Sequence, residues 1–237
     1  NWKLKQEPNR INTRLNQTLE YNLEVFKNKF IKKSLSFSPD NYTVEITLDF
    51  SEIKDLIYRD VRFSWVGGLS PTEKDSVDDK TYFNVAVYQG KEIEDLKVNE
   101  GQSETKKLNG STEWGAIRTK YFVSALIPKT PESIRFAEVS GRSDNQETYN
   151  LSFVFDCFQE SSFTLYHGPL EYEKIKSLAV DLDEIMDFGW SFIRPISKGV
   201  LYTLKRMHDY IPNYGVVLIV FSVLVKVLVF PLTKKSY

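Results

Sequence analysis

Residues 43–50 read T-V-E-I-T-L-D-F. Apolar side chains occupy the even positions of this stretch, beginning with Val44, and polar side chains occupy the odd positions between them. A strict period of two with one polar face is typical of an antiparallel strand that packs one face on a core. The stretch therefore predicts a sheet with one buried face and one solvated face.

Five further stretches have a strand-like composition, at residues 62–66, 81–88, 121–127, 133–139 and 149–158. Polar turns separate them, for example Gln89-Gly90 and Asn109-Gly110. The stretch at 149–158 is apolar at both odd and even positions, so we expect that strand to be covered on both faces. Residues 1–30 are polar and are expected to be irregular. Many strands joined by polar turns, with no helix between them, predict an antiparallel β-sandwich.

The composition changes after Gly168-Pro169. Residues 170–188 are rich in Leu, Ile and charged side chains, and Leu178, Leu182 and Ile185 recur at helical spacing. One helix or two short helices are predicted here. Four acidic residues cluster in this segment: Asp181, Asp183, Glu184 and Asp187. They are expected to form a solvated face and not a catalytic site.

Residues 190–208 predict a basic amphipathic helix. Its apolar side chains recur every three or four residues: Trp190, Ile193, Ile196, Val200, Leu204 and Met207. Its cations fill much of the remainder: Arg194, Lys198, Lys205 and Arg206. This composition is typical of a helix that lies in a bilayer interface. The alternative is a helix packed on the sandwich. Pro195 is expected in the first turn or two, or at a kink.

The next segment, residues 212–233, predicts a membrane-spanning helix. From Val216 to Phe230 the only residues that are not apolar are Ser222 and Lys226. Residues 214–232 would extend roughly 28 Å as a helix, close to the thickness of a hydrocarbon core of about 30 Å. Lys234 and Lys235 follow, and cationic flanks favour the cytoplasmic side, although residues 205 and 206 make the other flank basic too. The alternative is a buried helix of a soluble protein.

Charge divides the chain into two parts. From residue 188 onward seven Lys or Arg accompany one acidic residue, a net charge of +6, whereas the preceding 24 basic and 31 acidic residues give −7. An acidic body with a basic, apolar tail indicates a domain tethered to a membrane. It argues against a nucleic-acid partner, because the cations lie beside apolar stretches. The single cysteine, Cys157, excludes an internal disulfide and is expected to be an inert core thiol.

Several blocks resemble the YidC-type membrane protein insertases of bacteria. The stretch N-G-S-T-E-W-G-A-I-R-T-K-Y-F at 109–122 resembles a block of the family's periplasmic domain. The stretch D-F-G-W at 187–190, followed by Arg194-Pro195, resembles the start of its interfacial helix. N-Y-G at 213–215 and F-P-L-T at 230–233 resemble the two ends of the first helix of its core. The blocks stand in the family's order, over residues 25–237.

The resemblance implies a β-sandwich of the galactose-mutarotase-like type over residues 1–168. A helical connector over 169–188, an interfacial helix over 189–210 and a membrane helix over 212–233 would follow. It implies an insertase of the bacterial inner membrane, with residues 1–210 in the periplasm. The implied partners are the lipid bilayer and nascent membrane proteins, together with the Sec translocon and the ribosome through parts outside this chain. No enzymatic activity and no cofactor are implied.

Lys226 is the principal candidate site residue. It lies near the middle of the apolar span, where a charge costs about 2.5 kcal/mol or more and usually faces a hydrated cavity. The alternative is a side chain that reaches toward the cytoplasmic surface. Family members carry Arg at the matching position, inside a hydrophilic groove, so the resemblance implies the same place for Lys226.

Other candidates are weaker. Glu113-Trp114 follow a turn and would suit sugar stacking, although a Trp in this setting is more often part of the core. His167 and His208 have no Cys or His at ligand spacing, so no metal site is expected. The alternative function is a membrane-anchored carbohydrate-binding or sugar-processing sandwich, which requires a carboxylate pair beside a cleft with exposed aromatic side chains.

Overall fold

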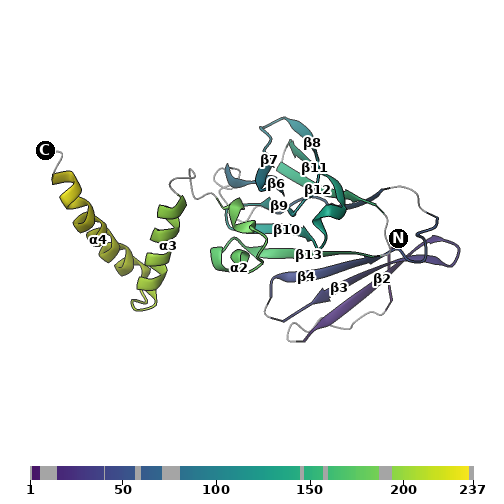
Figure 1. Ribbon diagram of the computed structural model, residues 1–237, viewed down its shortest axis with the longest axis horizontal. Coiled ribbons are helices and arrows are strands. Elements are labelled where there is room, and N and C mark those ends of the chain that lie inside the picture. Colours follow the sequence, from purple (N-terminus) through teal and green to yellow (C-terminus); the bar gives the residue numbers. More distant parts are fainter. Residues whose placement is uncertain are drawn as a thin grey trace. The chain divides into compact units, whose positions relative to one another are not determined.

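The computed structural model describes residues 2–5, 15–39, 41–56, 60–70, 81–144, 147–156, 160–186 and 194–234 (Figure 1). It divides into two compact units, Asn1–Ile185 and Met186–Tyr237. Each unit is described by itself below.

The first unit is built on two antiparallel sheets. The larger sheet has nine strands, in the spatial order β1 (Lys3–Leu4), β2 (Gln17–Phe26), β3 (Lys29–Phe37), β4 (Thr43–Asp49), β13 (Glu160–Pro169), β10 (Phe122–Pro128), β9 (Trp114–Arg118), β6 (Asn84–Gln89) and β7 (Glu92–Leu96). The smaller sheet has four, in the order β5 (Val61–Trp65), β12 (Glu147–Phe155), β11 (Ile134–Ser143) and β8 (Ser103–Asn109). A short 3-10 helix, η1, spans Pro131–Ser133.

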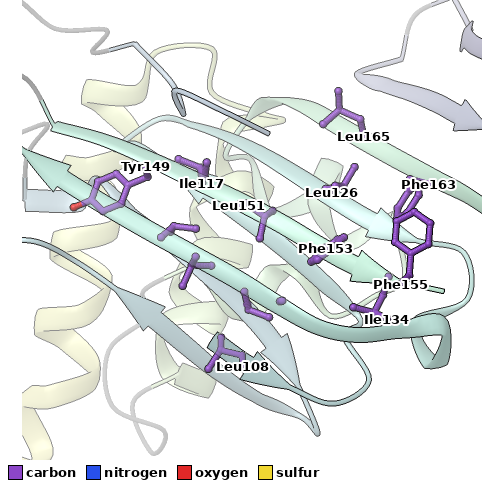
Figure 2. Close-up of a cluster of buried hydrophobic side chains, with 14 of the residues drawn as sticks. Leu108, Ile117, Leu126, Ile134, Tyr149, Leu151, Phe153, Phe155, Phe163 and Leu165 are labelled. Atoms are coloured by element: carbon purple, nitrogen blue, oxygen red, sulfur yellow. The ribbon is translucent and has the colours of Figure 1, made fainter. Parts of the chain in front are cut away.

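The core lies between the two sheets (Figure 2). Leu151, Phe153 and Phe155 of β12 project from the smaller sheet, and Phe163 of β13 meets them from the larger one, with its ring 5.5 Å from that of Phe155. Gly115 of β9, in the larger sheet, faces Leu151. A Cβ atom at Gly115 would be only 2.6 Å from a methyl group of Leu151. The absence of a side chain at this position lets the two sheets approach closely.

The predicted fold class is confirmed: the first unit is a mainly antiparallel β structure with two packed sheets. The stretch at 43–50 is β4, and the other five predicted stretches correspond to β5, β6, β10, β11 and β12 with ends shifted by a few residues. In β12, Leu151–Phe155 are buried on both faces, as expected.

The expectation that residues 1–30 are irregular is wrong where the structure describes them. Residues 17–26 form β2, and a two-residue turn at Lys27-Asn28 leads into β3. Asn28 adopts a left-handed conformation, with φ 57°, which the tight hairpin requires. Five other strands were not predicted, namely β1, β7, β8, β9 and β13.

Two short helical segments follow β13, α2 at Tyr172–Lys176 and η2 at Leu182–Ile185, which is one of the two arrangements predicted. They bury Ile175 and Leu182 completely.

A row of buried alanines crosses the larger sheet on the face away from the core. Ala86 pairs with Ala116, and Ala116 pairs with Ala125. Such small side chains permit close packing of a covering segment.

The prediction that the acidic group of this connector is uniformly solvated is wrong for Asp183. Its side chain is 2% exposed and accepts a hydrogen bond of 3.0 Å from Lys176. A buried carboxylate requires such a partner. Asp181 remains exposed, and Asp187 lies outside the described residues.

The second unit contains two helices, α3 (Arg194–His208) and α4 (Tyr214–Lys234). Pro195 is the second residue of α3, where a missing N–H costs nothing, so it lies in the first turn. Asn213 caps α4: its Oδ1 accepts a hydrogen bond of 2.8 Å from the N–H of Gly215. Between the helices, the His208 ring stacks on Tyr214 with centroids 3.7 Å apart. These contacts fix the turn between the two helices.

Candidate functional site

Helix α4 is long and apolar enough to cross a membrane. The span Tyr214–Pro231 has a mean hydropathy of 2.4, and only 6% of it is buried. The core helix of a soluble protein passes the same test of length and composition but would be mostly buried. Exposure of so many apolar side chains is costly in water, so a lipid environment suits α4.

Lys226 interrupts this apolar surface. It lies eight residues before Lys234, about 12 Å along the helix. Its side chain is exposed, and no ion pair to it forms among residues 194–234. Ser222 precedes it by four residues, so both lie on one face of α4. The Ser222 hydroxyl donates to the carbonyl oxygen of Leu218 at 2.7 Å, which satisfies it within the helix. Lys226 is the only charged residue between Tyr214 and Pro231.

Helix α3 is amphipathic, as predicted. Ile196 and Val200 are 64% and 36% exposed, and four residues place them on one face. Lys198 and Lys205 are seven residues apart, within roughly 20° of each other and on nearly the opposite face. Arg206 lies 3.4 Å from Asp209 and above the ring of Tyr210.

Of the two residues predicted at the start of the interfacial helix, the structure describes only one. Arg194 is the first residue of α3, and Trp190 lies outside the described residues. Tyrosines mark the region around the turn, since Tyr210 and Tyr214 are both exposed. Tyr side chains are enriched where a membrane meets water.

The sugar-stacking interpretation of Glu113-Trp114 does not fit the structure. Trp114 is 0% exposed and stacks on Tyr88 with ring centroids 5.3 Å apart, so it is part of the packing. His167 stands beside Trp65, at 6.1 Å between ring centroids. No group of three metal-ligating side chains occurs in the part of the chain that the structure describes. Cys157 lies outside that part.

Sequence reasoning missed one contact that holds the connector to the sheet. Arg118 is buried at the end of β9, and its Nη1 donates a hydrogen bond to the carbonyl oxygen of Ile185. Arg118 also lies above the ring of Tyr82. Its place in the resembling block W-G-A-I-R was visible, but its partner 67 residues away was not.

Comparison with known proteins settles the family. The model of the YidC periplasmic domain matches residues 1–199. The chain belongs to the YidC family. Among curated relatives of this YidC-family chain, the membrane protein insertase YidC of Chlorobium phaeovibrioides is 31% identical over 92% of the chain. That of Chlorobaculum tepidum is also 31% identical over 92%. The chain spans about 40% of the length of these YidC relatives.

One solved structure similar to this YidC-family chain is a galactose mutarotase related enzyme from Lactobacillus acidophilus. It covers 70% of each chain at 7% identity, with a TM-score of 0.36. A likeness of this size supports no functional inference. The curated relatives are membrane insertases, and α4 is a helix able to cross a membrane.

Proposed function

We propose that this chain is the extracytoplasmic domain, interfacial helix and first core span of a membrane protein insertase. The complete protein would act in the bacterial inner membrane on nascent membrane proteins, without catalysing a covalent reaction. Residues 1–210 would lie in the periplasm and the C-terminus in the cytoplasm. The Sec translocon and the ribosome would be reached through parts outside this chain. The family membership and the cation inside the apolar span of α4, Lys226, support this proposal.

The observation that carries the proposal is Lys226, on the same face of α4 as Ser222. An ammonium group in hydrocarbon is costly unless it meets water or an anion. A face that carries a hydroxyl and a cation is suited to the hydrated interior of a helix bundle. The opposite faces, made of Val, Leu and Ile, are suited to lipid.

A hydrated groove lined by this face of α4 would lower the free-energy barrier to insertion of a client protein in two steps. The acidic or polar flank of a client loses less solvation when polar groups and a fixed cation receive it. The apolar segment of the client then moves into lipid, where burial stabilises it by about 25 cal/mol per Å². No nucleotide is required by this route.

The test is a protease-protection assay in a depletion strain that expresses the full-length insertase. Clients are matched pairs whose translocated segments are acidic or neutral. Lys226→Ala should reduce insertion of the acidic client about fivefold relative to the neutral one, the effect of roughly 1 kcal/mol. Lys226→Arg should retain function, because it keeps the charge.

Lys234→Ala is the matched control, since it removes a cation from the end of the same helix. It should leave the ratio of acidic to neutral insertion unchanged. Expression of all variants is checked by immunoblot. If Lys226→Ala inserts both clients as the wild type does, Lys226 only extends toward the membrane surface and the groove proposal fails.

A further inference from the structure

A cleft of about 730 Å³ opens on the face of the larger sheet that points away from the core. Its floor comes from three central strands, through Glu45, Ile127 and Thr164. Tyr88 and Glu113 stand at one end, and the connector segment 177–181 forms a wall. A volume of this size lies within the range of about 300–1,000 Å³ that is typical of ligand pockets.

The carboxylates of the cleft are not equally neutralised. Glu45 is paired with Lys129 at 3.0 Å and accepts a hydrogen bond from Thr164 at 2.9 Å. Glu113 has one carboxylate oxygen that is buried and has no hydrogen-bond partner among the described residues. Asp181 is exposed and lies 3.8 Å from Lys176, whose closer partner is Asp183. Acidic character therefore remains at the end that holds Glu113 and Asp181.

The Tyr88 hydroxyl is subject to the negative electrostatic potential of these carboxylates. Burial raises its pKa, and the negative charges of Asp181, Glu184, Glu113 and Asp183 raise it further. The other cation on the lining, Lys91, is exposed to solvent. A positively charged group that entered this end would meet at least two carboxylates and a hydroxyl.

The wall of the cleft is conformationally strained. Ala179 and Asp181 have φ of 56° and 54°, in the left-handed region that L-residues seldom adopt. Buried neighbours on either side, Ile175 and Leu182, hold the segment in place. Backbone strain of this kind collects at binding sites, where the surrounding fold maintains it. Here it places Asp181 on the lining of the same cleft as Tyr88.

The lining favours a peptide over a sugar. Tyr88 is the aromatic side chain of the described lining, and it is only 7% exposed because its ring stacks on Trp114. A sugar would lack an open aromatic face. By contrast, Ile127, Leu178 and Val180 offer apolar contacts to an aliphatic stem that ends in a cation.

We propose that this cleft binds the cationic head of a Lys or Arg side chain in an extended polypeptide, between Glu113 and Asp181. The cleft would thereby give the sandwich an affinity for basic segments of unfolded chains. This goes beyond the insertase proposal and does not depend on Lys226.

The test is fluorescence polarisation with the full 237-residue chain in phosphatidylcholine nanodiscs, whose neutral surface does not attract basic peptides. The probe is a labelled pentapeptide with blocked termini and one central Lys among Ala and Gly. The same peptide with Arg should bind similarly, and the peptide with Gln should bind about tenfold more weakly, the effect of one charge-assisted hydrogen bond. Added salt should weaken binding of the Lys peptide.

Glu113→Gln and Asp181→Asn are the informative variants, and Asn tolerates the left-handed conformation that residue 181 requires. Each should lose most of the preference for Lys over Gln. Glu104→Gln, an exposed change on β8 of the other sheet, should keep it. Unchanged melting temperatures verify the fold.

Equal binding of the Lys and Gln peptides by the wild type would overturn the proposal, as would a full preference in both cleft variants. Saturable binding of a neutral disaccharide, with no binding of the Lys peptide, would assign the cleft to sugars instead. None of these measurements involves insertion, so the outcome is independent of the Lys226 assay.

Discussion

The Arg118 guanidinium donates a hydrogen bond to the carbonyl oxygen of Ile185, and so ties the end of the connector to strand β9. Arg118 and Ile185 are 7% and 6% exposed, so both partners of this hydrogen bond are largely shielded from water. The connector segment is therefore held at its last helical residue by a charged, buried donor. Ile175 and Leu182 hold it at two earlier points.

Replacing Arg118 with Met should lower the free energy of unfolding by about 2 kcal/mol, because a hydrogen bond from a charged donor is lost and a carbonyl is left unpaired. Hydrogen exchange at residues 182–185 should accelerate more than exchange in β4. Chemical denaturation and mass-spectrometric exchange measure both effects. Arg142→Met is the control, since Arg142 pairs with Asp144 at the surface, and it should cost under about 0.5 kcal/mol. An equal loss in both variants would contradict the anchoring role.

Gly115→Ala should destabilise the sandwich by about 1–3 kcal/mol through overpacking. The new methyl group would be 2.6 and 2.8 Å from the two methyl groups of Leu151, which is itself buried. Adding Leu151→Val should recover part of the loss in a double-mutant cycle. The same change at Gly199, where nothing lies within 4 Å, should not destabilise the chain. Additive effects at Gly115 and Leu151 would show that the sheets relax apart.

Tyr166 predicts a specific loss of stability at alkaline pH. Burial raises the pKa of its hydroxyl from 10.0 to about 12, with a further contribution from the charge of Glu171. The raised pKa means that folding favours the protonated form. Its contribution is complete below pH 10 and is lost as the pH rises toward 12. Ionisation also removes the hydrogen bond that the hydroxyl donates to Pro169 at 2.8 Å.

Denaturant midpoints measured from about pH 9.5 to about pH 11.5 test this expectation. Tyr166→Phe should be less stable at the lower pH and should lose less stability across the range than the wild type. Tyr121→Phe, at an exposed side chain, should keep the wild-type slope. Identical slopes for Tyr166→Phe and the wild type would refute the assignment.

Helix α3 should lie at the bilayer surface with Ile196 and Val200 toward lipid. Spin labels on Val200→Cys and Tyr202→Cys, in a Cys157→Ser background, provide a matched pair on one helix. The label at residue 200 should be more accessible to oxygen, which concentrates in lipid. The label at residue 202 should be more accessible to a water-soluble nickel reagent. Equal accessibility of the two labels would remove the interfacial assignment.

The strands that were predicted share a clear period or a dense apolar run. Strand β4 alternates strictly, and β12 ends in a dense apolar run, L-S-F-V-F at 151–155. Strand β2 also alternates, at Leu19, Tyr21 and Leu23, but polar residues lie among them and Val25 and Phe26 break the alternation at its end. Strand β9 is buried at all five positions, so it has no period of two, and Gly115 makes it resemble a turn. In β9, burial on both faces removes the period of two, and Gly115 and Arg118 interrupt the apolar run that would otherwise indicate a buried strand.

The two candidate sites, the Lys226 face of α4 and the cleft on the larger sheet, also differ in how far the sequence predicts them. Ser222 and Lys226 are four residues apart, so their common face follows from helix geometry. The cleft instead assembles residues from Asn41 to Asp181, and its strained wall contains Ala179, a residue type that gives no warning of a left-handed conformation. Contacts between distant strands and a connector depend on the tertiary fold and have no fixed spacing in the chain.

The composition of α4 has a consequence for how the protein itself enters a membrane. Thirteen of the 15 residues at 216–230 are apolar, and together they favour transfer into a bilayer by roughly 4–8 kcal/mol, against a penalty of about 3 kcal/mol for the lysine. The partition free energy remains favourable without any neighbouring helix. This segment would therefore insert independently, before the rest of an insertase core has assembled around it. The later arrival of neighbouring helices would then relieve a penalty that the segment had already tolerated alone.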